Sequence, residues 1–281
     1  MYLSHLLIDV GGNPDRPRPG RRWLGNIYHV HQRLCMAFPS EARVQRDGDF
    51  LQPFKEEDFP LLRNPDAKPE DPRHSFLFRI DNSTKENSPR AIILVQSAFK
   101  PDWHYAFHNA NAFLAAPPEC KPYDPTFTAK QELRFRIRIN LSKKGKTSKD
   151  GADLRTPRNG TDKKGRPKDQ GKRVSLTWDE DQGPDEAIQD WFAGKGEHHG
   201  FALRDFHLLQ VGWVTGYRPG KKTPCDEHDD GHPERRMKFR SALLEGTLTV
   251  TDAAALQQVI ASGIGSAKAF GFGLMSLLPL S

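Results

Sequence analysis

The chain has 281 residues, of which 36% are hydrophobic and 28% charged, and its formal net charge is +6 at pH 7. This length suits two domains of about 100–150 residues each. Every apolar run falls short of the roughly 18 residues that a membrane helix needs, and the first residues do not resemble a signal peptide. Three widely spaced cysteines, Cys35, Cys120 and Cys225, cannot build a disulfide framework. We therefore expect a cytoplasmic protein that makes no membrane contact.

The first part of the chain predicts a β-α-β-β-α-β order. Alternating apolar residues and polar turns predict strands at 2–10, 75–80, 90–98 and near 123–128. Asn26 can cap a helix over 27–38, which Pro39 ends, and Asp102 can cap a second helix over 103–114. The Arg/Pro/Gly-rich segment 11–25 and the Pro-rich, acidic segment 41–73 are expected to be surface loops.

The second part repeats this order. The patterns predict strands at 133–140, 206–216, 237–250 and 272–278, and helices at 184–192 and 253–260, the latter capped by Asp252. Residues 141–173 have almost no apolar content, so we expect a flexible insertion there. Two consecutive units of this kind predict an α+β protein of two tandem ferredoxin-like domains, 1–122 and 123–281, an arrangement that RNA-recognition-motif domains share with many unrelated proteins.

Charge is unevenly distributed over this plan. Residues 134–173 hold 15 Lys/Arg against 4 Asp/Glu, whereas residues 174–200 hold 7 acidic residues and 1 base. Alternation places three arginines on one side of the strand, and the adjoining insertion adds lysines and an arginine; the candidate phosphate contacts are Arg134, Arg136, Arg138, Lys143, Lys144, Lys172 and Arg173. The alternative is a solvated sheet edge beside a disordered loop.

A glycine string over 263–273 is the most specific feature of the sequence. Gly263, Gly265, Gly271 and Gly273 frame a segment that contains Lys268. Glycines permit positive φ and let backbone N–H groups approach a ligand, and the lysine adds a charge for a phosphate. A single glycine here would be a helix C-cap, a role that Gly263 or Gly265 can also have.

This string matches the glycine-rich loop of the RAMP superfamily of CRISPR proteins. Further segments, 1–4, 28–32, 135–140 and 244–250, are similar to the CasE family. CasE proteins are the CRISPR RNA-processing endoribonucleases of the type I-E Cascade complex. The resemblance therefore implies binding of a CRISPR repeat stem-loop, its cleavage at the 3′ base, and retention of the product among the other Cascade subunits.

The helix over 27–38 carries the candidate catalytic pair. At 100° per residue, Tyr28 and His31 are neighbours on one flank of a buried stripe that includes Val30 and Leu34. Such a pair taken alone is more often structural. The CasE resemblance implies that His31 is the general acid or base and that Tyr28 orients or stabilises the scissile group. RNA supplies its own 2′-OH nucleophile, so the implied reaction needs no metal or cofactor and leaves a 2′,3′-cyclic phosphate.

Basic residues flank two other segments. Arg21 and Arg22 precede the candidate catalytic helix and are candidate phosphate clamps. A polar loop joins the strands at 206–216 and 237–250, and the basic residues around it are Lys221, Lys222, Arg235, Arg236 and Lys238. In CasE-like proteins a basic hairpin from the second domain enters the deep groove of the repeat stem-loop. Double-stranded RNA is recognised mostly by shape and phosphate, so a basic hairpin is adequate for this task.

Two rival functions stay open on the residues alone. One is a non-catalytic RNA-binding subunit of the RAMP superfamily, which would have no need of the Tyr28 and His31 pair. The other is a metal-dependent nuclease that uses Cys225, His228 and His232, a cluster without a second cysteine. His104 and His108 also have a zinc-like spacing, but no HExxH string and no third ligand accompany them. We expect surface histidines there and no metal site.

Overall fold

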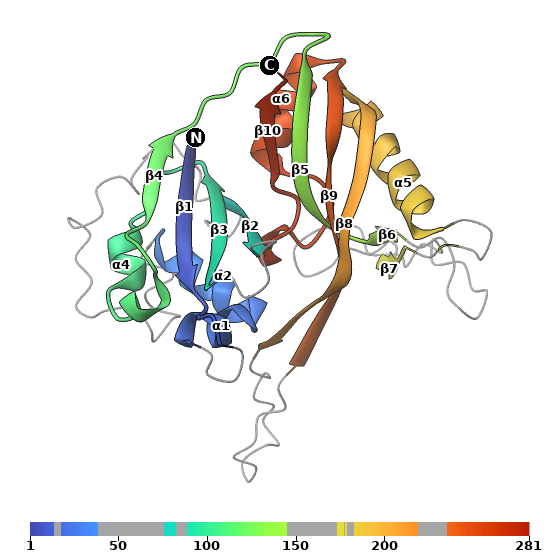
Figure 1. Ribbon diagram of the computed structural model, residues 1–281. Helices are drawn as coiled ribbons and strands as arrows, with labels where there is room; N and C mark the ends of the chain where they lie inside the picture. Colours follow the sequence, from blue (N-terminus) through green and yellow to red (C-terminus); the bar gives the residue numbers. More distant parts are fainter. Residues whose placement is uncertain are drawn as a thin grey trace, which may run out of the picture.

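The computed structural model describes residues 1–13, 18–38, 76–82, 89–144, 173–176, 178, 183–218 and 235–280. Two four-stranded antiparallel sheets lie beside each other, with strand orders β2-β3-β1-β4 and β10-β5-β9-β8 (Figure 1). Counted within its own half of the chain, each sheet has the same order, in which the first strand lies between the third and the fourth. This order and its helical crossovers confirm the predicted pair of ferredoxin-like units in an α+β protein.

The first unit follows the predicted order with two additions. Its elements are β1 (Tyr2–Asp9), α1 (Pro19–Leu24), α2 (Ile27–Met36), β2 (Phe76–Asn82), β3 (Arg90–Ser97), α4 (Trp103–Phe107), the 3-10 turn η4 (Asn111–Phe113) and β4 (Glu119–Pro122). The predicted caps Asn26 and Asp102 are confirmed, because their side chains accept hydrogen bonds from the amides of Tyr28 and Tyr105.

The second unit contains the longest strands. Its elements are β5 (Glu132–Asn140), β6 (Ser142–Lys144), β7 (Arg173–Ser175), α5 (Pro184–His199), β8 (Phe201–Arg218), β9 (Arg235–Val250), α6 (Ala253–Ser262), η5 (Lys268–Phe270) and β10 (Met275–Pro279). Asp252 caps α6 as predicted. The β8–β9 hairpin continues well past its sheet and reaches the level of α1 and α2 (Figure 1).

Three predictions for the first unit are wrong. The segment 11–25 is not all loop, because Pro19 begins the short helix α1 and its Trp23 is buried against aromatic rings of α4 and η4. The helix predicted over 103–114 ends at Phe107, and the 3-10 turn η4 follows it over Asn111–Phe113. The last strand is 119–122 rather than 123–128; it is an exposed edge strand, so it lacks an alternating pattern.

In the second unit the two short paired strands β6 and β7 were not predicted, since both ends of the insertion expected to be flexible form strands, and the other errors concern element ends. Helix α5 continues to His199, beyond its predicted end, through two glycines, which are unfavourable in helices. At Gly196 a Cβ atom would lie only 2.5 Å from the carbonyl oxygen of Phe201. Strand β8 begins at Phe201, before the predicted start, because two irregularities in its register with β9 break the alternation. Strand β10 begins at Met275, after the last glycine of the string. None of the described helices could span a membrane.

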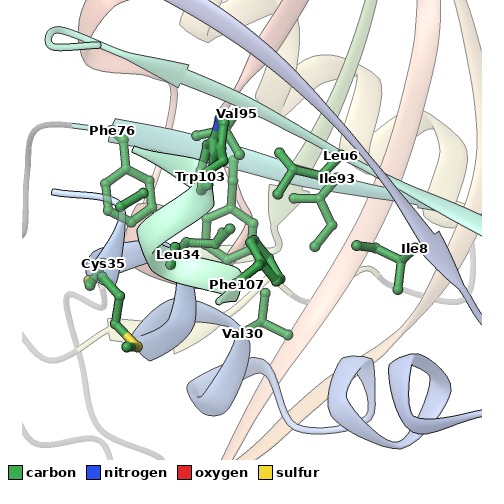
Figure 2. Close-up of a cluster of buried hydrophobic side chains, with 14 of the residues drawn as sticks. Leu6, Ile8, Val30, Leu34, Cys35, Phe76, Ile93, Val95, Trp103 and Phe107 are labelled. Carbon is green, nitrogen blue, oxygen red and sulfur yellow. The ribbon is translucent and has the colours of Figure 1, made fainter. Parts of the chain in front are cut away.

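Each unit has its own hydrophobic core. In the first, α2 and α4 cover one face of the sheet (Figure 2). The rings and aliphatic chains packed there include Leu6, Ile8, Val30, Leu34, Phe76, Ile93, Val95, Trp103 and Phe107. This burial fixes the position and rotation of α2, and therefore of the side chains on its flank.

Buried polar side chains join the two units. Arg79 on β2 is only 3% exposed, and its guanidinium pairs with Asp81. The same group donates hydrogen bonds to the carbonyl oxygen of Arg136 at 2.8 Å and to Ser276 Oγ at 2.9 Å, both in the second unit. Gln96 on β3 likewise donates to the carbonyl oxygen of Ile260 at 2.7 Å. Because a buried charge needs such partners, these bonds fix how the sheets meet.

Candidate functional site

Helix α2 places Tyr28 and His31 at the edge of the first core. Val30 and Leu34 are fully buried, whereas Tyr28 and His31 are half-buried and His29 is exposed. This arrangement confirms the predicted helix face. The pair therefore lies where a substrate can meet a side chain that is held by packing on one side.

Aromatic rings from both units surround His31. Its ring lies 6.0 Å from the ring of Phe76 on β2 and 5.6 Å from that of Phe270 in η5, measured between centroids. Phe270 in turn stacks on Phe239 of β9 at 5.2 Å. Sγ of Cys35, one helical turn away, is 3.6 Å from His31 Nε2. The imidazole thus sits at the junction of the two units, and the glycine string supplies one of its neighbours.

The glycines of the string allow this junction to close. Gly271 has φ +83°, and a Cβ atom there would lie 3.1 Å from the ring of Phe78 on β2. Gly273 has φ +85°, and its Cβ atom would lie 2.5 Å from the carbonyl oxygen of Ile264. Gly263 ends α6, as the cap reading predicts, and Gly265 lies beside Trp191. Gly271 therefore permits close packing between the units, whereas Gly273 permits close packing within the second unit.

Lys268 belongs to a cationic cluster at the same loop. Its Nζ donates to the carbonyl oxygen of Ser262 at 2.7 Å, and burial lowers the pKa of Lys268. Burial also lowers the pKa of His199, at the end of α5, and the nearby charges of Lys195, His198 and Lys268 lower it further. The charges of Lys195 and Lys268 beside this loop are suited to bind an anion such as a phosphate.

The three arginines of β5 differ in their surroundings. Arg134 is exposed, Arg136 is paired with Glu245 on β9, and Arg138 donates to Ser241 Oγ at 3.2 Å. Burial lowers the pKa of Arg138, and Asp81 partly offsets this shift. The predicted common face therefore exists, but two of its arginines also hold protein groups. Arg134 is the most open of the three to a phosphate.

Other predicted basic residues are distributed as follows. Arg21 donates to the carbonyl oxygens of Val10 and Gly11, both at 2.8 Å, so it secures the loop before α1, whereas Arg22 is exposed. Lys143, Lys144, Arg173 and Arg235 lie in strands, but nothing is described of their side chains. Lys172, Lys221 and Lys222, and the cluster from Cys225 to His232, lie outside the described residues.

The β8–β9 hairpin has one face toward α2 and one toward solvent. Val214 and Phe239 pack on the first core. On the opposite face Trp213 and Tyr217 are 54% and 38% exposed, and they stand across from Arg240 and Arg236 in the strand register. Lys238 Nζ, on the same face, lies 4.0 Å from the centroid of the Trp213 ring. This aromatic and basic face is what nucleic-acid bases and phosphates require.

The aromatic members of that face were missed from the sequence. Their signal was present, since Val211, Trp213, Thr215 and Tyr217 alternate with smaller residues. Arg79 was also missed, and no local pattern distinguishes it. Histidines His104 and His108 lie on or just after α4, and His108 Nδ1 contacts the carbonyl oxygen of Tyr105. Within the described ranges, no group of three or more His, Cys, Asp or Glu side chains could hold a metal ion.

A family model described as CRISPR associated protein matches residues 1–279, which is nearly the whole chain. The chain belongs to this family. Two curated relatives agree: the CRISPR-associated endoribonuclease Cse3 of Thermus thermophilus is 26% identical over 99% of the chain, and the CRISPR system Cascade subunit CasE of Escherichia coli K12 is 27% identical over 100% of it. Both are covered over their full lengths. The resemblance of the sequence to CasE is therefore confirmed.

Solved structures of the family have the same fold. The CRISPR endoribonuclease Cse3 bound to a 19 nt RNA is 25% identical, with a TM-score of 0.59 over 99% of this chain and 100% of that one. The Cas6e protein of Escherichia coli K-12 is 22% identical, with a TM-score of 0.52 over the full length of both chains. The chain therefore has the fold of these family structures.

Proposed function

We propose that this chain is the endoribonuclease that cuts the repeat stem-loop of precursor CRISPR RNA, with His31 and Tyr28 as its catalytic residues. One observation carries the assignment of residues: α2 holds His31 at the junction of two RNA-recognition-like units in a family whose Thermus relative is an endoribonuclease. A half-buried histidine between two substrate-holding surfaces is a suitable proton-transfer group.

The reaction follows from the substrate. The RNA 2′-OH attacks the adjacent phosphorus, its proton leaves, and the departing 5′-oxygen takes up a proton. His31 transfers one of these protons, and Tyr28, one helical turn earlier, orients or stabilises the scissile phosphate through its hydroxyl. The products are a 2′,3′-cyclic phosphate and a 5′-hydroxyl. Aromatic packing around the imidazole limits its rotation, so the ring is already oriented before RNA binds.

The second unit holds the RNA in this proposal. The exposed guanidinium of Arg134, the cations around Lys268, and Arg236 and Lys238 on the hairpin offer contacts to phosphates. Trp213 adds an aromatic surface on which a base can stack. We assign the unit boundary to 122/123, between β4 and the strand β5.

The product stays bound in this proposal and joins the other Cascade subunits; the Escherichia coli relative is itself named as a Cascade subunit. We place the protein in the cytoplasm, a reducing compartment that suits the exposed thiol of Cys120.

A cleavage assay tests the function. A labelled RNA of the host's CRISPR repeat is incubated with excess protein and excess EDTA, and the variants His31→Ala and His29→Ala are compared with the wild type. Removing a general acid or base lowers the rate by roughly 10²–10⁴-fold. We expect this loss for His31→Ala with unchanged RNA affinity, and wild-type cutting for His29→Ala, since His29 lies on the exposed side of the same helix.

Each rival function predicts a different result. A non-catalytic subunit binds the RNA but cuts under no condition. A metal-dependent nuclease loses its activity in EDTA and recovers it when a divalent cation is restored. Equal cutting by wild type and His31→Ala would reject His31 as the catalytic group while leaving the nuclease function standing.

A further inference from the structure

We propose that Asn26 is a positioning residue for the cleavage reaction, because it ties the start of the catalytic helix α2 to the hairpin that holds the RNA. This inference rests on the proposed function. The positions of Tyr28 and His31 depend on the Asn26 side chain, which bonds to both units. A movement of the hairpin when it binds RNA is therefore transmitted to the catalytic pair.

The hydrogen bonds of the Asn26 amide carry the proposal. Its Oδ1 accepts from the backbone N–H of Tyr28 at 3.1 Å, which is the usual N-cap bond. The same Oδ1 accepts from the backbone N–H of Tyr217 on β8 at 3.0 Å, and Nδ2 donates to the carbonyl oxygen of Tyr217 at 3.2 Å. Both backbone groups of one hairpin residue are therefore paired with the cap of the catalytic helix.

These bonds are made at the open edge of the second sheet. Strand β8 is the outer strand of its sheet, so its free edge presents backbone groups that a neighbouring strand would normally satisfy. At Tyr217 the Asn26 amide takes that place. The link is therefore made to the backbone of the hairpin and follows its position, whichever side chains the hairpin carries.

Close packing surrounds the link. Gly216 is buried, and a Cβ atom there would lie 2.9 Å from Ile27 Cγ2 and 3.2 Å from Asn26 Oδ1. Only glycine lets β8 come this near to the first turn of α2. On the opposite face of the hairpin, Trp213 and Lys238 form the surface proposed to hold RNA. The hairpin thus lies between the RNA surface and the catalytic helix.

The other two side-chain caps in the described helices lack this second role. Asp102 accepts from the amide of Tyr105 at 2.8 Å, and Asp252 accepts from the amides of Ala254 and Ala255 at 2.9 and 3.0 Å. All three bonds lie within a helix's own first turn. A carboxylate is sufficient for that purpose, whereas donation to the carbonyl oxygen of Tyr217 needs an amide.

Three variants separate capping from coupling. Asn26→Ser keeps an N-cap acceptor but is too short to pair with Tyr217, and Asn26→Ala loses both functions. Asp252→Ala removes a cap of similar strength without touching the hairpin. Two quantities are measured for each: the dissociation constant for the host's repeat RNA, and the single-turnover cleavage rate with protein in saturating excess.

We expect both Asn26 variants to lose about 10-fold or more in the single-turnover rate, since a displacement of about 1 Å at the reacting groups costs up to 10²-fold. Their RNA affinity should stay within about threefold of wild type, which corresponds to about 0.6 kcal/mol, because Asn26 bonds to the hairpin backbone and not to the surface proposed to hold RNA. Asp252→Ala should unfold more readily yet cut at the wild-type rate. The cleavage rate would then depend on the hydrogen bonds to Tyr217 and not on the stability of the fold.

Two results would overturn the proposal: wild-type cutting by Asn26→Ser, or an equal loss of rate in Asp252→Ala. Should the wild type itself fail to cut, the proposed function is wrong, and amide hydrogen exchange of α2 still decides the coupling. Binding of a repeat RNA with a 2′-deoxy scissile nucleotide should then slow exchange in α2 of the wild type but not of Asn26→Ser. Equal slowing in both would reject the coupling.

Discussion

The two units have the same strand order but use it differently. In the first, strands β2 and β3 stay within their sheet, and helix α2 carries Tyr28 and His31 on its flank. In the second, the β8–β9 hairpin runs past its sheet and carries an exposed aromatic and basic face. In the proposed function, one architecture therefore supplies a rigid support for chemistry in one copy and an extended surface for RNA in the other.

Neither unit completes the site alone. His31 comes from the first unit, but Phe270 beside it comes from the second, and the Tyr217 backbone that holds Asn26 also comes from the second. The junction between the sheets is thus part of the site. Variants at the junction, on the hairpin face proposed to hold RNA, and near the loop that contains Lys268 test these different roles of the two units.

The largest effect is expected from Arg79→Met. The variant leaves Asp81 without its buried partner and removes donors from the carbonyl oxygen of Arg136 and from Ser276. Breaking a buried charge pair costs about 3–5 kcal/mol. We expect the free energy of unfolding in urea to fall by that amount.

A surface pair is the control for Arg79. Arg18→Met breaks the bond from Arg18 Nε to Asp9 at 3.0 Å, in which Arg18 is mostly exposed, and such pairs contribute about 1 kcal/mol or less. Similar losses in the two variants would mean that Arg79 does not hold the units together.

The second effect concerns RNA affinity. Trp213→Ala removes the largest exposed ring of the hairpin, and stacking of one base on an aromatic ring is worth about 1–3 kcal/mol. We expect the dissociation constant for the repeat RNA to rise roughly 5- to 100-fold, with an unchanged single-turnover rate at saturating protein. Trp213→Phe retains a stacking face and should bind nearly as well as wild type. A drop in rate without a drop in affinity would place this ring in the chemistry instead.

Local signals in the sequence predicted much of this arrangement. The alternation of β5, the apolar stripe of α2 and the caps Asn26 and Asp252 depend on neighbours within one turn or one strand, so composition and spacing were enough. The CasE resemblance added the candidate pair. The helix α1 was missed because its Pro, Gly and Arg residues are typical of loops, although Trp23 is buried.

The rest depends on how distant segments pack. No spacing relates Asn26 to Tyr217, Phe270 to His31, or Arg79 to the carbonyl oxygen of Arg136, since each contact joins the two units. The same limit applies to the arginines of β5. Alternation placed them on one face, but it could not show that Glu245 lies against one of them.

A smaller effect is expected from Lys238→Gln. If Lys238 contacts a phosphate, the variant should bind RNA more weakly and reduce the slope of log affinity against log salt by about 1. Lys121→Gln, on the exposed edge strand β4 of the first unit, is the matched control and should leave the slope unchanged. Equal slopes in all three proteins would remove the hairpin lysine from the RNA surface.

The smallest effect concerns stability against pH at the cationic loop. Burial, and then the charges of Lys195, His198 and Lys268, hold the pKa of His199 below its ordinary value of 6.5. As the pH falls through 6.5 the unfolded chain binds a proton before the folded chain does, so the folded state loses stability. His199→Gln cannot take up this proton and should lose less stability between pH 7.5 and pH 5.5, measured by urea unfolding.

An identical pH slope in His199→Gln and wild type would show that burial and the neighbouring charges do not lower the pKa of His199 in the folded state. The same titration with bound repeat RNA sharpens the comparison between the units. Phosphates near Lys268 would offset the repulsion and bring the pKa of His199 closer to its ordinary value, so the slope of the wild type should shrink toward that of the variant. A slope that RNA leaves unchanged would place the RNA away from the loop. The hairpin would then be the part of the second unit that binds the RNA.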